Sequence, residues 1–273
     1  PVESAADQLV MAKWILRTLA WQYGFDITFA PKITEGKAGS GLHFHTRIMN
    51  GEHSVMLKDG RLSDEARKAI AGYMTCASSL TAFGNANPTS YFRLVPHQEA
   101  PTSICWGDRN RSVLVRVPLG WTGKSDMSAI ANGLPQNPDI VMPDKQTVEL
   151  RSGDGSADIH LMLAGLVTAA RIGFELPDAL EIAKKTYVDV NIHDAKNAAI
   201  LNSLAQLPTS CAESADELEK NRALYEAKGV FSKSMIDGRI AMLRAYNDAN
   251  IREEVKRDKG LMMELVRRYY HCG

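Results

Sequence analysis

The order of hydrophobic patterns along the chain is the feature that most constrains its fold. A helical pattern comes first, and short strand patterns separated by loops rich in Gly, Pro and Asn fill the middle. From Ser156 onward the pattern is almost wholly helical. Strands that are followed by a run of helices are typical of α+β folds. The sequence therefore predicts an α+β domain with a mixed portion over residues 1–155 and a helical C-terminal portion over residues 156–273.

Apolar spacing and capping residues predict the separate elements. Ser63 has the character of a helix N-cap, and Ser214 with Glu217 has the pattern of a capping box. Two expected helices span residues 4–23 and 63–82. Three more are expected to begin near Ser214, Ser232 and Gly260. The expected strands are residues 26–30, 42–49, 102–106, 113–117 and 148–152.

Composition excludes some classes of partner. The chain has 273 residues, with 32 Lys and Arg against 32 Asp and Glu, so its formal net charge is zero. Such a balance provides no overall attraction to nucleic acid or to an anionic membrane, and we expect neither as a partner. Affinity for phosphate would have to come from local clusters of basic residues.

The cysteines and the apolar runs bear on location. The four cysteines are far apart and form no C-x-x-C pair, which predicts reduced thiols rather than a disulfide framework. No uninterrupted apolar run approaches the roughly 20 residues that a membrane span needs. No secretory signal is visible at the start of the sequence. We therefore expect a cytoplasmic protein.

The clearest local motif is the strand that follows Gly39-Ser40-Gly41. Side chains alternate along a strand, so His43, His45 and Arg47 are predicted to share one face, opposite a mostly apolar face. The glycines before the strand allow a ligand to approach the backbone closely. The pattern fits a metal or phosphate site and fits a solvated strand equally well. A metal-dependent hydrolase that uses both histidines as ligands is one alternative.

Two further segments place charges within apolar strands. Glu149 and Arg151 flank Leu150, so a carboxylate and a guanidinium fall on one strand face. Arg116 lies in the strand that Arg111 precedes, and an arginine there needs a carboxylate or a phosphate as its partner. A salt-bridge network and a nucleotide site both remain possible. The glycine fingerprints of Walker-type and Rossmann-type nucleotide sites are absent.

Taken in order, these motifs resemble those of the glutamine synthetase family over nearly the whole chain. Several co-linear motifs make this resemblance more specific than any one of them. The segments that carry it are Thr28-Phe29-Ala30-Pro31-Lys32, Gly39 to His45, Ser90 to Pro96, Glu99-Ala100-Pro101, Asn110-Arg111-Ser112, Glu149 to Ala157, Leu207-Pro208 and Gly229-Val230-Phe231. The resemblance implies the mostly antiparallel, curved sheet of that family's catalytic domain, flanked by helices and followed by a helical subregion.

The resemblance implies a metal site and an ATP site. His43 and Glu149 would be ligands of one divalent ion, either Mg²⁺ or Mn²⁺, and a histidine ligand suits Mn²⁺ better. His45, Arg111 and Arg116 would bind ATP, and Arg111 would also be catalytic. The implied activity is that of a ligase that joins glutamate to ammonia through an acyl phosphate, at the expense of ATP.

The resemblance also implies a glutamate site with a cover. Arg93 and Arg151 would hold the carboxylates of glutamate, and Gly39 would offer it a backbone contact. Glu99 would lie on a flap over the substrate and accept a proton from the incoming ammonium. The tail of the chain would contribute to a homo-oligomer in the full-length protein.

The sequence departs from the family in two respects. The family takes further metal-binding glutamates and a small β domain from segments that would precede Pro1, and no Glu-x-Glu strand replaces those glutamates. The chain alone is therefore expected to lack appreciable ligase activity. Ala38 and the pair His97-Gln98 replace commoner family residues near the substrate. A γ-glutamyl ligase for a polyamine or another small amine, and a non-catalytic relative, thus remain alternatives to an ammonia ligase.

Overall fold

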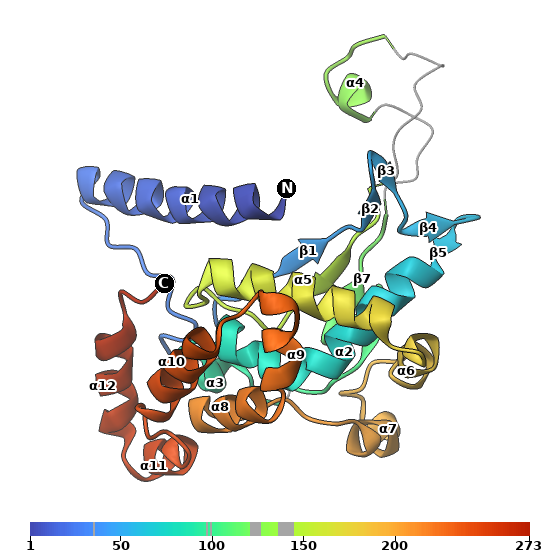
Figure 1. The fold of residues 1–273 in the computed structure, drawn as a ribbon. Coiled ribbons are helices and arrows are strands. Elements are labelled where there is room, and N and C mark those ends of the chain that lie inside the picture. Colours follow the sequence, from blue (N-terminus) through green and yellow to red (C-terminus); the bar gives the residue numbers. More distant parts are fainter. Residues whose placement is uncertain (35, 97, 99, 121–126, 136–144) are drawn as a thin grey trace.

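A small sheet lies at the centre of the computed structural model, which describes residues 1–34, 36–96, 98, 100–120, 127–135 and 145–273 (Figure 1). Its four strands have the spatial order β1-β8-β7-β6. These strands are β1 (Phe44–Thr46), β6 (Trp106–Asp108), β7 (Val115–Val117) and β8 (Val148–Leu150). β8 is antiparallel to both of its neighbours, and β7 is parallel to β6. The prediction of a mostly antiparallel sheet in an α+β fold is confirmed.

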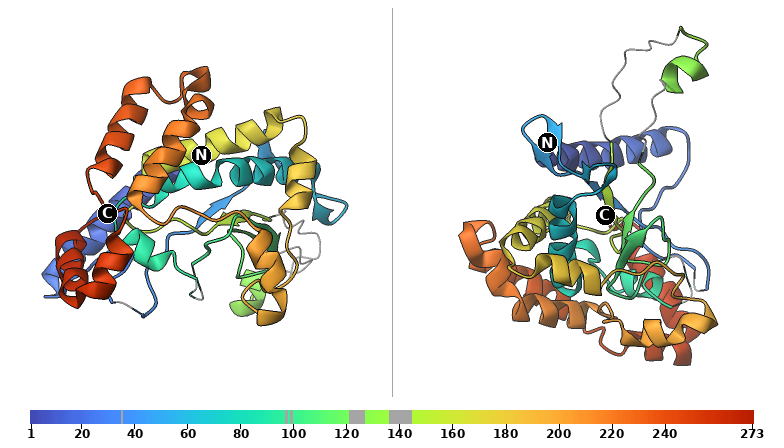
Figure 2. Two further views of the ribbon diagram at one scale, coloured as in Figure 1. Left: turned by 90° about the horizontal axis from the view of Figure 1, so that it is seen from below. Right: turned by 90° about the vertical axis from the view of Figure 1, so that its right-hand side faces the viewer.

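Two long helices cover one face of this sheet. They are α2 (Asp64–Gly84) and α5 (Ile159–Glu175), and Figure 2 shows them lying side by side. Ser63 caps α2 as predicted, because its side chain accepts a hydrogen bond from the Ala66 N–H. Asp158 caps α5 in the same way. Both helices bury much of their length, so the pair forms the centre of the hydrophobic core.

Glycines bring α2 and α5 unusually close together. A Cβ atom built on Gly72 would lie 1.9 Å from the Ala169 carbonyl oxygen, and one built on Gly173 would lie 1.9 Å from the Lys68 carbonyl oxygen. Only hydrogen atoms can occupy these two positions, so the two backbones pack directly against each other. The spacing between α2 and α5 therefore depends on both glycines.

Shorter helices form the remainder of the chain. The helices α8 (Cys211–Lys220) and α10 (Lys233–Arg244) pack against each other, and α8 also packs on α2. The others are α3 (Ser90–Arg93), α4 (Met127–Ala131), α6 (Ala179–Lys185), α7 (Ala198–Ser203), α9 (Arg222–Glu226), α11 (Ile251–Arg257), α12 (Lys259–Tyr269) and the 3₁₀ turns Ala195–Asn197 and Ala227–Gly229. Two small hairpins pair β2 (Met49–Asn50) with β3 (His53–Ser54) and β4 (Leu57–Lys58) with β5 (Arg61–Leu62).

The predicted capping box is wrong. The helix α8 begins at Cys211, and Ser210 caps it by accepting from the Glu213 N–H. Ser214 lies inside the helix, where its buried hydroxyl lies 2.6 Å from the Tyr91 hydroxyl and 2.6 Å from the Thr81 hydroxyl. Ser214 is thus a buried core residue, and its spacing from Glu217 matches a capping box without forming one. The helix expected near Ser232 does begin there, with Ser232 as its cap.

Two predicted strands are also wrong. Residues 26–30 form no strand, although Ala30 is buried and the Thr28 hydroxyl donates to the Tyr270 carbonyl oxygen. In the segment 102–106 only Trp106 belongs to a strand, while Ser103 forms an isolated bridge with Gln206. Both segments are extended but have no continuous neighbouring strand to pair with. An apolar pattern alone cannot distinguish that situation from a true strand.

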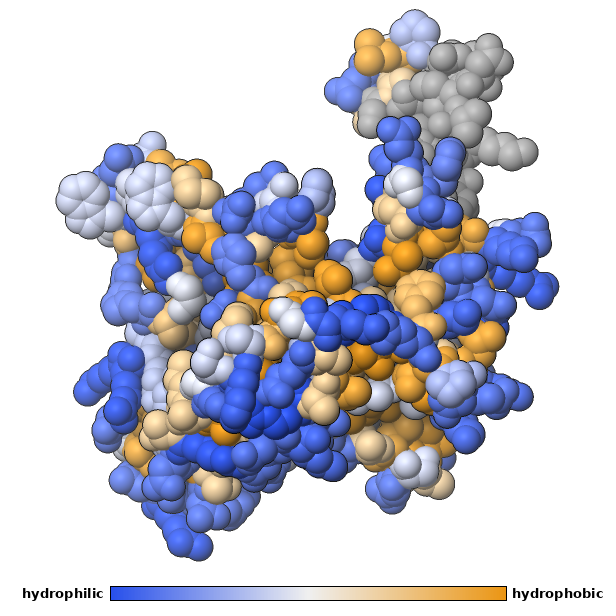
Figure 3. Space-filling model, in the orientation of Figure 1, coloured by the Kyte–Doolittle hydropathy of each residue, from blue (hydrophilic) through white to orange (hydrophobic). Residues whose placement is uncertain are grey.

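The first helix, α1 (Val2–Gln22), ends near Gly24 as predicted but begins before Ser4. It lies over the end of α5 (Figure 1), and the Lys13 ammonium donates to the Gly155 carbonyl oxygen over 2.7 Å. Its helically spaced apolar residues include several exposed side chains, among them Trp14 and Leu19. Apolar residues also reach the surface along α5 (Figure 3), where Val167 and Phe174 are exposed.

Among the described residues, no single helix is both long enough and apolar enough to cross a bilayer. The helices α5 and α6 taken together have the length and composition of a membrane span, but they are bent by 110° where they meet.

Candidate active site

The polar residues of three neighbouring strands lie in one row across the sheet. Glu149 of β8 is the Cα partner of His45 on β1 and of Arg116 on β7. Cross-strand partners project from the same face of a sheet, so the three side chains lie on one face. The opposite face carries Phe44, Val115 and Leu150, which are buried in the core. The alternation predicted for residues 42–48 therefore places the polar side chains away from α2 and α5.

Glu149 is the centre of this group. Its side chain is only 1% exposed, and its Oε1 atom lies 2.7 Å from His43 Nδ1. Its other oxygen, Oε2, lies 2.6 Å from Arg116 Nε. His45 Nε2 and Arg151 Nε each lie 3.9 Å from Oε1. One buried carboxylate thus faces two imidazoles and two guanidiniums, and the guanidiniums supply the opposite charge that its burial requires.

The Glu149 contacts leave bonding capacity at one oxygen. Although Arg116 Nε is close to Oε2, the two atoms do not form an aligned hydrogen bond, and both are buried without one. A carboxylate oxygen without a hydrogen bond can accept a further donor or bind a cation. The described side chains therefore stabilise the carboxylate mainly through charge.

Burial and the neighbouring charges act in opposite directions on His43. Burial lowers the pKa of the His43 imidazole below its ordinary value of 6.5, the Glu149 carboxylate raises it, and the guanidiniums of Arg151 and Arg93 lower it. The net shift is downward. The imidazole is therefore neutral at pH 7, which is the form that can donate an electron pair to a metal ion.

An NMR titration of the His43 ring is expected to show a midpoint below 6.5. In Glu149→Gln the midpoint should fall further, because the only raising influence is removed. A pKa lowered by folding means that the unfolded chain takes up the proton more readily. The stability that neutral His43 contributes should therefore be present above pH 6.5 and decline as the pH falls below it. A midpoint above 6.5 would show that the contact with Glu149 outweighs burial.

A small cavity of about 140 Å³ adjoins this row of side chains. Arg93, which ends α3, lines this cavity and donates to the Ser152 carbonyl oxygen over 2.8 Å. A Cβ atom on Gly41 would lie 2.5 Å from Arg93 Nη2, so the glycine leaves room for the guanidinium. The residues that line the cavity are Ala38, Gly39, Gly41, His43, Arg93, Gln98, Ala100 and Arg151.

The lining of this small cavity is suited to an anion. Arg93 and Arg151 are both buried, and the loss of water lowers the pKa of Arg151 below its usual value. Arg151 donates to the Arg111 carbonyl oxygen and, over 3.2 Å, to the Val113 carbonyl oxygen, which hold its guanidinium in place. Two guanidiniums fixed at one cavity can bind carboxylate groups in a defined geometry.

The hydrogen bond between Lys32 and Gln98 was not predicted from the sequence. The Lys32 side chain is 2% exposed, and its ammonium donates to Gln98 Oε1 over 2.7 Å and to the Lys37 carbonyl oxygen. Since an ammonium can only donate, it orients the Gln98 amide with its oxygen toward Lys32. Burial, with the Arg93 charge, lowers the pKa of Lys32. A lysine next to a proline in a loop gives no sequence signal of burial.

The structure brings together most of the predicted site residues. Those gathered on this face are Gly39, His43, His45, Arg93, Arg116, Glu149 and Arg151. The Arg111 side chain is exposed, and its charge acts on Arg151 from nearby. Glu99 and His97 lie outside the described residues, so the predicted flap carboxylate is not placed. Arg47 is exposed just after the end of β1.

A metal ion would find two of its ligands here. Within the described ranges, no group of three or more His, Cys, Asp or Glu side chains could hold a metal ion. His43 and Glu149 do converge, and the buried Glu149 Oε2 atom has no hydrogen bond. An oxygen and a nitrogen donor suit Mn²⁺ and are compatible with Mg²⁺. The donor set therefore fits such an ion in part and needs ligands from elsewhere.

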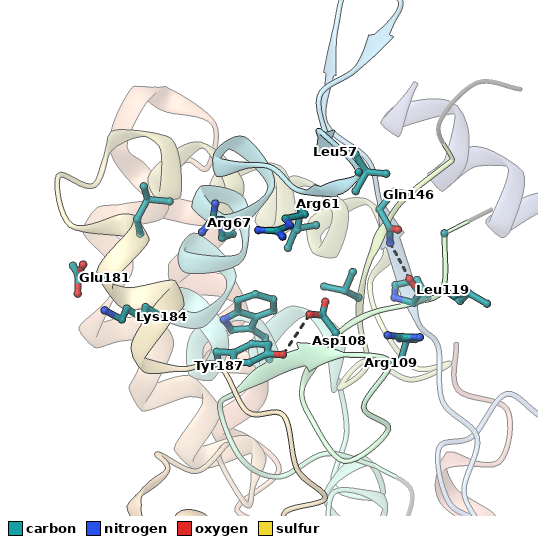
Figure 4. Close-up of a pocket in the computed structure, with 17 residues that line it drawn as sticks. Leu57, Arg61, Arg67, Asp108, Arg109, Leu119, Gln146, Glu181, Lys184 and Tyr187 are labelled. Atoms are coloured by element: carbon teal, nitrogen blue, oxygen red, sulfur yellow. Dashed lines mark hydrogen bonds between the residues drawn. The ribbon is translucent and has the colours of Figure 1, made fainter. Parts of the chain in front are cut away.

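A larger cavity lies in a different place. It has a volume of about 850 Å³ and lies between the β4–β5 hairpin, α2, α6 and the strand β6 (Figure 4). None of the predicted site residues lines it. We therefore identify the candidate active site by its chemistry rather than by cavity size.

Comparison with known proteins agrees with this geometry. Residues 2–260 match the model of the family described as glutamine synthetase, catalytic domain. The glutamine synthetase of Thermococcus kodakarensis is 32% identical over 233 residues, which are 85% of this chain and 47% of that protein. That of Mycobacterium bovis is 32% identical over 245 residues, which are 88% of this chain and 46% of the relative. The chain thus spans about half the length of the curated relatives it matches.

Solved structures show the same fold. The Plasmodium falciparum glutamine synthetase superposes with a TM-score of 0.69 at 22% identity, covering 92% of this chain and 52% of that one. A crystal structure described as a novel glutamine synthase homolog gives 0.68 at 24% identity, with 97% and 53% covered. This chain belongs to the glutamine synthetase family and has the fold of its catalytic domain.

Proposed function

We propose that this chain supplies one face of the active site of a glutamine synthetase-type ligase, which joins ammonia to the side-chain carboxylate of glutamate at the expense of ATP. The observation that carries the proposal is the convergence of His43 and Glu149, 2.7 Å apart, beside a cavity with two buried guanidiniums. Membership of the family supports the ligase class. The roles of the separate residues follow from their positions around Glu149.

Glutamate would bind in the small cavity. Arg93 and Arg151 would hold its carboxylates, because both guanidiniums are fixed by backbone carbonyl oxygens before any substrate arrives. Gly39 lines the same cavity, where its lack of a side chain keeps its backbone within reach of a ligand. The exposed Ala38 offers no side-chain polar group there.

Mg²⁺ or Mn²⁺ would be held by the His43 imidazole and the Glu149 carboxylate, together with ligands outside the described cluster. When bound, such an ion neutralises phosphate charge and polarises the bond that is broken during transfer. Arg116 would contribute to the same task, since its guanidinium already lies beside Glu149 and would face phosphate oxygens. Arg111, which is exposed at the edge of the site, and His45 would contact the nucleotide.

The reaction would take place in two steps. The side-chain carboxylate of glutamate attacks the terminal phosphorus of ATP, forming γ-glutamyl phosphate and releasing ADP. Ammonia then attacks the acyl carbon, phosphate leaves, and glutamine forms. Glu99 would accept the proton that ammonium must lose before it can attack. Positioning and charge neutralisation carry most of such a transfer, and a site of guanidiniums that would also hold a divalent ion suits that task without a protein nucleophile.

The chain by itself is proposed to be inactive. It spans about half the length of its curated relatives, and the part that the structure describes offers two converging metal ligands rather than three. With ATP, glutamate, ammonium and Mn²⁺, the purified chain is expected to release no ADP at a steady rate. Steady turnover would contradict this. Methylamine or a polyamine in place of ammonium, supplied to the full-length protein, tests the alternative amine substrates.

A binding measurement tests the ligase proposal independently of turnover. In calorimetry, glutamate is expected to bind the chain in the presence of Mn²⁺ and ADP, and Arg93→Gln is expected to weaken that binding by about tenfold or more. Arg257→Gln on α11, where the arginine is exposed, serves as the matched control and should bind as the unmodified chain does. If glutamate fails to bind, or binds both variants equally, the proposed glutamate site is wrong.

A further inference from the structure

The large cavity shown in Figure 4 is separate from the candidate active site. Trp106 and Asp108 of β6 are the Cα partners of Val115 and Val117, whereas Gly107 is the partner of Arg116. Because alternate residues point to opposite faces, Trp106, Asp108 and Val117 project away from Glu149 and toward the helices. The cavity therefore lies on the reverse face of the sheet, and a ligand there would not compete directly for the Glu149 site.

Positive charge predominates in this cavity. Arg61, Arg67, Arg109 and Lys184 line it, against the carboxylates of Asp108 and Glu181. Arg67 is paired with Asp64 at 2.6 Å, and Asp108 accepts from the Tyr187 hydroxyl at 3.3 Å. Over the ranges that the structure describes, no ion pair or hydrogen bond of a side chain engages Arg61, Arg109 or Lys184. Cations that line a concave surface without a protein partner favour an anionic ligand.

The cations come from three sides of the cavity. Arg61 leads β5 and Arg67 lies in the first turns of α2, and both line the cavity near the β4–β5 hairpin (Figure 4). Lys184 comes from the end of α6, on another wall. Two neighbouring guanidiniums and an ammonium offer more donors than one carboxylate group can use, and they suit the oxygens and the double charge of a phosphate ester better.

Two aromatic residues, Trp106 and Tyr187, also line this cavity. The rings of Trp106 and Tyr187 are in edge contact, with their centroids 4.8 Å apart. Trp106 is 5% exposed, and its indole N–H donates to the Ala183 carbonyl oxygen over 2.6 Å, so it is a fixed support. Tyr187 is 39% exposed and lines the cavity. A partly exposed tyrosine held by a buried tryptophan can stack against a flat ring.

The backbone at Arg109 adds a separate indication. Arg109 has a φ of 54°, in the left-handed region that non-glycine residues rarely adopt, and its N–H is held by the Val117 carbonyl oxygen over 2.8 Å. Such conformations have a free-energy cost and are concentrated at ligand-binding sites. Here the strained residue carries one of the unpaired guanidiniums into the wall of the cavity.

We propose that this cavity is a second ligand site, which binds a small phosphate ester that carries a flat ring. Arg61 and Arg67 hold the phosphate from the side of the β4–β5 hairpin, Lys184 adds positive charge from the α6 wall, and the ring lies against Tyr187. Its volume of about 850 Å³ is within the range of small-molecule sites. The ligand is independent of glutamate and ATP, since none of the residues assigned to those substrates lines the cavity.

The test uses phenyl phosphate as the probe, with no ATP and no divalent ion present. The indole N–H resonance of Trp106, assigned with Trp106→Phe, is expected to shift during titration, whereas those of the exposed Trp14 and Trp21 on α1 stay in place. Arg61→Gln and Lys184→Gln should each weaken binding by about tenfold. Phenol and inorganic phosphate should each bind more weakly than phenyl phosphate.

Matched controls come from neighbouring exposed lysines outside this cavity. Lys58→Gln on β4 and Lys185→Gln on α6 should bind phenyl phosphate as the unmodified chain does. Arg116→Gln, on the other face of the sheet, should also leave the Trp106 shift unchanged. The proposal is overturned if the Trp106 resonance does not shift, if Arg61→Gln and Lys184→Gln bind normally, or if only Arg116→Gln abolishes binding.

Discussion

Replacing Glu149 with alanine is expected to lower the free energy of unfolding by about 3 kcal/mol. The carboxylate is 1% exposed and faces the guanidinium of Arg116 at 2.6 Å, with that of Arg151 nearby at 3.9 Å. Without it, two guanidiniums and the adjacent imidazoles remain in the same partly buried space with no opposing charge. Removal of one partner from a buried charge network costs far more than the network contributes as a whole. Urea unfolding curves measure the difference directly.

The Glu149→Gln variant serves as the control for shape. Glutamine keeps the volume and one oxygen acceptor but loses the negative charge. The free energy of unfolding should therefore fall less in Glu149→Gln than in Glu149→Ala, but still measurably. The slope of its unfolding free energy against urea concentration should match that of the unmodified chain, since the surface exposed on unfolding is unchanged. An alanine variant within about 0.5 kcal/mol of the unmodified chain would show that the guanidiniums are satisfied without Glu149.

Replacing Gly72 with alanine is expected to lower the free energy of unfolding by about 3 kcal/mol, through steric conflict rather than charge. The added Cβ atom would lie 1.9 Å from the Ala169 carbonyl oxygen and 2.8 Å from the Gly173 nitrogen, both of which are backbone atoms of α5. Backbone cannot move aside as the end of a side chain can, so α2 and α5 would have to separate. Thermal and urea unfolding of the variant measure the loss.

Gly238 provides the matched control for this substitution. It lies on the exposed side of α10, and no atom lies within 4 Å of a Cβ atom built on it. Alanine there should raise stability by about 0.5 kcal/mol or more, because alanine has the higher helix propensity. If Gly72→Ala and Gly238→Ala had the same effect, the close packing of α2 on α5 would be wrong.

The fold could be predicted from the sequence where local signals and tertiary packing agree. Ser63 and Ser232 cap the helices that the sequence pattern predicted at those positions. Ser214 shows the opposite case, because its position before Glu217 reflects a buried hydroxyl network and not a helix start. Residues 26–30 have the apolar character of a strand but no strand beside them. Pairing depends on distant segments, which a local pattern cannot report.

The candidate site was predictable in part for the same reason. Alternation along the strand placed His43 and His45 on one face, and the apolar context of Arg116 required a partner for its charge. The identity of that partner, Glu149, depends on the register between β7 and β8, which residue spacing alone could not supply. Lys32 and the cavity lined by Arg61 had no signal at all, because burial and concavity arise only when segments far apart in the sequence meet.

The proposed ligase site requires His43 and Glu149 to act as one metal-binding pair. Anomalous diffraction from crystals grown with Mn²⁺ and an ATP analogue tests this most directly. The predicted result is a manganese peak within about 2.0–2.3 Å of both the His43 imidazole and a Glu149 carboxylate oxygen. A manganese ion bound elsewhere, with His43 and Glu149 still joined only to each other, would contradict it.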